Sequence, residues 1–130
     1  MSAPPLLAAA AILAVATGIV HSYLGERLIF RHLRHASIVP SRPAPPLRER
    51  HVRILWASWH LASVFAWVVA SLLWRAAKQG GAALPIDGLL KASAAGFFAG
   101  ALLVLVATRG RHPGWLALAA VALLSWLGLT

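Results

Sequence analysis

The chain has 130 residues, of which 60% are hydrophobic and 12% charged, and its mean hydropathy is +0.76. Soluble domains carry about a quarter charged residues, so this composition excludes an ordinary soluble domain, a disordered chain and a coiled coil. The absence of cysteine excludes disulfides and thiolate chemistry. The formal charge is +9, and the basic residues flank apolar segments. This pattern indicates anionic lipid headgroups as partners, not nucleic acid.

Four long apolar segments follow one another along the chain: residues 6–24, 54–74, 86–107 and 115–129. A membrane-spanning helix needs about 20 apolar residues, which the first three segments provide. The fourth is shorter, but Pro113 suits the start of a helix, and Trp115 and Trp126 suit the two membrane interfaces. No Lys or Arg precedes the first segment, which predicts a retained helix and not a cleaved signal peptide. We therefore predict one all-α integral membrane domain over residues 1–130, a bundle of four transmembrane helices.

The basic connection between the first two segments covers residues 26–53. Residues 26–36 alternate basic and apolar side chains and predict an amphipathic helix at the cytoplasmic membrane surface. Residues 40–46 contain four prolines and predict a stiff, extended connector.

The distribution of Lys and Arg predicts the orientation. Nine of these residues lie on the side of the first connection and the third turn, and three lie on the other side. Positively charged loops stay in the cytoplasm. The sequence thus predicts a multi-pass protein of the plasma (inner) membrane with both termini outside the cytoplasm.

Ionisable residues beside or within the apolar segments gather on the predicted cytoplasmic side: His21, Glu26, His60 and His112. Charged and polar groups are costly in a bilayer, so each needs a reason to be there. His21 lies roughly 7 Å inward from Glu26, and His60 roughly 10 Å inward from Arg53, at 1.5 Å per helical residue. We therefore expect the two imidazoles at one depth on neighbouring antiparallel helices, with His112 closing over them.

Helical spacing assigns these residues to faces. The second helix carries a polar stripe at intervals of three and four residues: Arg53, Trp56, His60, Ser63 and Trp67. The first helix carries an arc of about 140° at 100° per residue: Gly18, His21, Ser22, Gly25 and Glu26. Lipid disfavours such faces, so both are expected to face the bundle interior. His21 and Glu26 lie at opposite edges of the arc, and the tryptophans are interpreted as packing residues and interface anchors.

The first functional hypothesis is a metal or haem site. Imidazole and carboxylate groups suit Zn, Fe or Cu, and the predicted ligands are His21, Glu26, His60 and His112. In a variant of this hypothesis, His21 and His60 hold a haem between facing helices.

Two alternatives remain open. The first is a proton or ion channel or transporter, in which His60 titrates near neutral pH. The second is an enzyme or receptor for an anionic lipid or amphiphile, with Arg53, Arg109 and Arg111 holding the headgroup. The sequence contains no nucleophile elbow, phosphate loop or HExxH motif, so it indicates no reaction class.

Small residues recur every four positions in the third segment, and Gly96 and Gly100 form a GxxxG motif. Such motifs let two helices approach closely. The motif fits packing within one chain, and it fits a homo-oligomer.

The chain contains three short motifs in this order: His21-Ser22-Tyr23-Leu24-Gly25-Glu26, Trp59-His60 and Arg111-His112-Pro113. The pattern resembles that of small bacterial membrane proteins with four spans. The resemblance covers most of the chain and implies no activity, cofactor or substrate.

Overall fold

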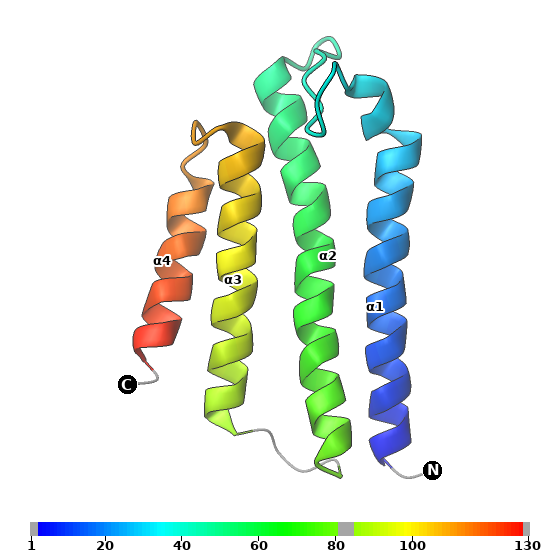
Figure 1. The fold of residues 1–130 in the computed structure, drawn as a ribbon, viewed down its shortest axis with the longest axis vertical. Coiled ribbons are helices and arrows are strands. Elements are labelled where there is room, and N and C mark those ends of the chain that lie inside the picture. Colours follow the sequence, from blue (N-terminus) through cyan, green and yellow to red (C-terminus); the bar gives the residue numbers. More distant parts are fainter. Residues whose placement is uncertain (1–2, 81–84, 129–130) are drawn as a thin grey trace.

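The computed structural model describes residues 3–80 and 85–128 and is all-helical there. It contains α1 (Ala3–Leu28), a short 3-10 helix η1 (Phe30–Leu33), α2 (Glu49–Lys78), α3 (Ile86–Thr108) and α4 (Gly114–Leu127). The four α-helices stand side by side in chain order, each antiparallel to the one before it (Figure 1). By length and composition, α1, α2 and α3 can each cross a membrane. The prediction of an all-helical chain with long apolar helices is therefore confirmed.

The connection between α1 and α2 differs from the prediction. It covers residues 29–48, because α1 continues to Leu28 and α2 already begins at Glu49. The separate amphipathic helix expected over residues 26–36 is wrong, since residues 26–28 belong to α1 and Phe30–Leu33 forms a single 3-10 turn. Phe30 is 3% exposed and packs edge-on against the indole of Trp59 on α2, with ring centres 6.0 Å apart. The chain therefore packs against α2 directly after α1 ends.

The fourth apolar segment forms a helix that is shorter than the others. With 14 residues, α4 is about 21 Å long, whereas the hydrocarbon core of a bilayer is about 30 Å thick. Residue 129, the last of the predicted span, lies outside the described residues. A fourth complete span therefore stays a prediction.

Small side chains bring the helices together. Ala57 on α2 and Ala107 on α3 are fully buried and, with Val104, form a core against which Trp115 and Leu118 of α4 pack. Large apolar side chains instead point outward, as Leu13, Val106 and Leu124 do at 65 to 68% exposure. This distribution is typical of helices whose outer faces meet lipid, since small residues favour close helix contacts in membranes.

The GxxxG motif contacts α2 of the same chain. A Cβ atom on Gly96 would lie 2.5 Å from Cγ2 of Val68, and one on Gly100 would lie 2.7 Å from Cδ1 of Leu61. Packing of α3 against α2 therefore accounts for the motif without a second copy. The homo-oligomer through Gly96 and Gly100 stays an untested prediction.

Replacing Gly96 with alanine should destabilise the α2–α3 contact by about 1 to 2 kcal/mol, because the new methyl group overlaps Val68. The loss is measured as a lower Tm of the detergent-solubilised chain. Gly88→Ala is the control on the same helix, since the nearest atom to its new Cβ is 4.0 Å away. Equal melting of the two variants would contradict the close contact.

Candidate functional site

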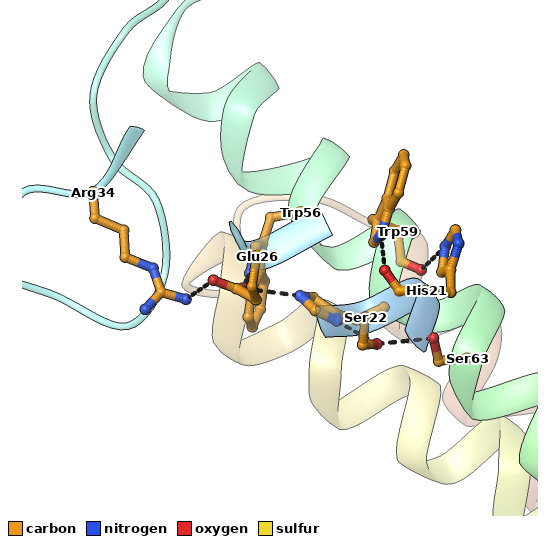
Figure 2. A network of polar contacts seen from close by, with 8 residues as sticks. His21, Ser22, Glu26, Arg34, Trp56, Trp59 and Ser63 are labelled. Carbon is orange, nitrogen blue, oxygen red and sulfur yellow. Dashed lines mark hydrogen bonds and ion pairs between the residues drawn. The ribbon is translucent and has the colours of Figure 1, made fainter. Parts of the chain in front are cut away.

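A band of polar side chains joins α1 to α2 at the end of the helices that carries residues 29–48 (Figure 2). The predicted polar arc of the first helix faces most of the predicted polar stripe of the second, whereas Arg53 of that stripe faces α3. We call this band the α1–α2 network. It consists of His21, Ser22 and Glu26 from α1, Arg34 from the loop, and Trp56, Trp59, His60 and Ser63 from α2.

Glu26 is the acceptor at the loop end of the network. Its Oε1 accepts a hydrogen bond from Nε1 of Trp56 at 2.5 Å and lies 3.1 Å from Nε2 of His60. Its Oε2 accepts a hydrogen bond from the guanidinium of Arg34 in an ion pair. Three elements therefore converge on one carboxylate, whose side chain is only 27% exposed. Since Trp and Arg side chains are donors only, the geometry suits the ionised carboxylate.

His60 is bonded at both ring nitrogens. Its Nε2 faces Glu26, and its Nδ1 lies 2.8 Å from the hydroxyl of Ser22. That hydroxyl is in turn hydrogen-bonded to the hydroxyl of Ser63 at 2.8 Å, and Ser63 is 2% exposed. A chain of hydrogen bonds thus runs from the loop end of α1 into the apolar interior.

His21 pairs with Trp59 instead of joining this chain. The rings stack with centres 4.4 Å apart and planes 6° apart. Nε2 of His21 lies 3.2 Å from the carbonyl oxygen of Trp59, and Nε1 of Trp59 donates to the carbonyl of His21 at 3.0 Å. A carbonyl only accepts, so Nε2 of His21 carries a proton. Gly25 makes the pairing possible, because a Cβ atom there would overlap the indole.

The predicted anion-binding arginines lie at a second place, between the start of α2 and the turn after α3. The guanidinium of Arg53 donates to Oε1 of Glu49 and to the carbonyl of Ala107, both at 2.8 Å. Arg109 and Arg111 are exposed on the α3–α4 turn beside it. The structure therefore brings all three predicted arginines to one cleft.

Comparison of the chain with protein families, curated proteins and solved structures finds no match.

The four predicted metal ligands do not converge. His112 lies on the α3–α4 turn, where its Nδ1 accepts the backbone N–H of Gly114. Both nitrogens of His60 already face Ser22 and Glu26, so a metal would have to displace one of them. Across residues 3–80 and 85–128, no group of three or more His, Asp or Glu side chains is arranged to hold a metal ion. A metal or haem at these residues stays a prediction that the geometry does not favour.

Sequence reasoning places Trp56 on the polar stripe without assigning it a hydrogen bond, and it misses the polar roles of Arg34 and Trp59. The two tryptophans were interpreted as packing residues, yet each indole N–H donates to α1. One signal was present: Trp56 stands one turn before His60, so both reach the same carboxylate. No comparable signal exists for Arg34, because the path of the loop is not periodic.

Proposed function

We propose that the protein is an integral membrane protein that binds and releases a proton at His60, within the α1–α2 network. Three helices of sufficient length and apolarity support insertion in a membrane. The observation that carries the proton site is the bonding of His60, with a carboxylate at Nε2 and a hydroxyl at Nδ1.

Both protonation states of His60 can be hydrogen-bonded without moving the helices. In the neutral ring, Nε2–H donates to Glu26 and Nδ1 accepts the hydroxyl proton of Ser22. In the charged ring, Nδ1–H donates to the Ser22 oxygen, whose proton turns toward Ser63. A hydroxyl can rotate between these roles. Nδ1 of His60 therefore has a hydrogen-bond partner whether or not it carries a proton. A histidine with a purely structural role does not need this.

The charges around His60 come from each neighbouring segment. Glu26 on α1 faces Nε2 of His60, and Arg34 of the loop forms an ion pair with the same carboxylate. On α2, Arg53 lies two turns away and is held by Glu49. His21 is the other titratable group at this level of α1, and it faces Trp59. The charged group in direct contact with His60 is thus the carboxylate of Glu26.

Proton uptake by the purified full chain tests the proposal. Between roughly pH 8 and pH 5, His60→Gln should take up about one proton fewer than wild type. Ser58→Ala, an exposed position on α2, is the control and should leave the count unchanged. Equal uptake by wild type and His60→Gln would contradict the proposal, and circular dichroism verifies that each variant is folded.

The same samples distinguish the two other hypotheses. Wild type in liposomes should not acidify the lumen faster than empty vesicles do, because the described hydrogen-bond chain ends at Ser63. If wild type acidifies the lumen and His60→Gln does not, the protein conducts protons and the proposal of a binding site alone is wrong. Elemental analysis should give no stoichiometric metal. A metal that is present in wild type and lost in His60→Gln would instead support a metal centre at His60.

The proposed membrane orientation has the basic loop in the cytoplasm. The chain contains no cysteine, so single-cysteine variants are labelled at one site. A membrane-impermeant maleimide should label Gln79→Cys in intact spheroplasts and Ser37→Cys only after permeabilisation, since both positions are exposed and lie at opposite ends of α2. The reverse pattern would contradict the orientation.

A further inference from the structure

A basic cleft lies outside the α1–α2 network, between the first turn of α2 and the α3–α4 turn. Its volume is about 680 Å³, and none of the network residues lines it. Five arginines and one acid line it: Arg48, Arg50, Arg53, Arg109, Arg111 and Glu49. Five positive charges and one negative charge give a formal charge of +4 before any histidine is counted. The volume is within the range of roughly 300 to 1,000 Å³ typical of small-molecule sites.

The floor of the cleft is fixed. Arg53 is 6% exposed, and its guanidinium binds both Glu49 and the last turn of α3 at Ala107. Glu49, the acid of the cleft, is therefore already engaged by an arginine. Because the buried guanidinium of Arg53 holds α2 against α3, the backbone that carries the other arginines of the cleft is fixed in position.

Two arginines of the rim have free binding capacity. Within residues 3–80 and 85–128, the guanidinium groups of Arg109 and Arg111 form no hydrogen bond and no ion pair. They act on Glu49 only through the electrostatic field. A concentration of unpaired like charges around a cleft is unfavourable by itself, and an anion would relieve it.

Phosphate is the anion whose chemistry fits these groups. Guanidinium forks bind phosphate oxygens through paired, charge-assisted hydrogen bonds. The first N–H groups of α2 point toward the same end and add a favourable dipole. The cleft is lined by the start of α2 and the turn after α3, at the end of the helices that carries the basic loop. In the proposed membrane orientation, lipid headgroups would lie at this end.

We propose that this cleft binds a phosphate group, supplied either by an anionic membrane lipid or by a soluble phosphate. The site is independent of proton binding at His60, since the two share no residue.

Calorimetric titration of the full chain in a neutral detergent tests the site. The probes are dihexanoyl phosphatidylglycerol and inorganic phosphate. Dihexanoyl phosphatidylcholine, whose phosphate is balanced by its own choline cation, is the control lipid of zero net charge. Arg109→Gln/Arg111→Gln should weaken binding about tenfold or more, because each lost bond is to a charged group. Arg75→Gln/Lys78→Gln removes the same charge at the other end of α2 and should leave the affinity unchanged. Glu49→Gln should bind about two- to fivefold more tightly.

Each result decides. If only phosphatidylglycerol binds and Arg109→Gln/Arg111→Gln weakens its binding, the source of the phosphate is a lipid headgroup. If only inorganic phosphate binds in this way, the source is a soluble ion. Binding of neither probe overturns the proposal. Equal weakening by the two double variants also overturns it, since that result would reflect total charge and not the cleft.

Discussion

Replacing Glu26 with leucine is expected to destabilise the protein by about 2 to 4 kcal/mol. The carboxylate accepts from Arg34 of the loop and from Trp56 and His60 of α2, so its loss leaves three donors from two segments without their acceptor. Its side chain is 27% exposed, so water replaces part of the lost bonding and the effect stays below that of a fully buried pair. The change is measured as the free energy of unfolding in mixed micelles.

Two substitutions serve as controls for this loss. Glu26→Gln keeps the size and one acceptor oxygen but removes the charge, so it should cost about 1 to 2 kcal/mol. Glu49→Gln removes the carboxylate of a pair whose acid is 47% exposed, so it should destabilise the protein much less than Glu26→Leu does. Equal effects of Glu26→Leu and Glu49→Gln would show that Glu26 does not hold the network.

Replacing Gly25 with alanine is expected to cost about 2 to 4 kcal/mol, which is unusual for so small a change. The new methyl group would overlap the rigid indole of Trp59, with its Cδ1 only 2.7 Å away. The indole must then move, which breaks its hydrogen bond to the carbonyl of His21 and its stacking on the imidazole. A lower Tm and a change in tryptophan fluorescence report both losses.

A double-mutant cycle separates this overlap from general effects on the helix. In the background Trp59→Phe, the smaller ring leaves room, so Gly25→Ala should have little further effect. Gly88→Ala measures how much stability alanine adds through its higher helix propensity at a position without a close neighbour. Additive effects of Gly25→Ala and Trp59→Phe would contradict the contact between them.

The faces of α1 and α2 could be predicted from the sequence because helical spacing fixes them. Ser22 and Glu26 are four residues apart and reach the same histidine, whereas His21, at the other edge of the arc, contacts Trp59. The same arithmetic of 1.5 Å per residue predicted His21 and His60 at one depth, but His21 contacts Trp59 and not His60.

The sequence did not reveal what the loops do. Arg34 reaches Glu26 only because the chain turns inward at Phe30, and no periodicity encodes that turn. His112 is predicted to lie over the other histidines. In the structure it lies on the sharp α3–α4 turn, where Arg109 has a φ of 53° and the His112 ring accepts the N–H of Gly114 at the start of α4. Tertiary packing decides both outcomes, so local pattern could not.

The most direct measurement of the central claim is the ¹⁵N NMR spectrum of the histidine side chains during a pH titration, with His60 assigned by comparison with His60→Gln. The neutral ring should carry its proton on Nε2, toward Glu26, and leave Nδ1 bare toward Ser22. Acidification should then protonate Nδ1 reversibly while the helices stay folded. A neutral ring protonated on Nδ1, or a ring that takes up no proton down to roughly pH 5, would contradict the account.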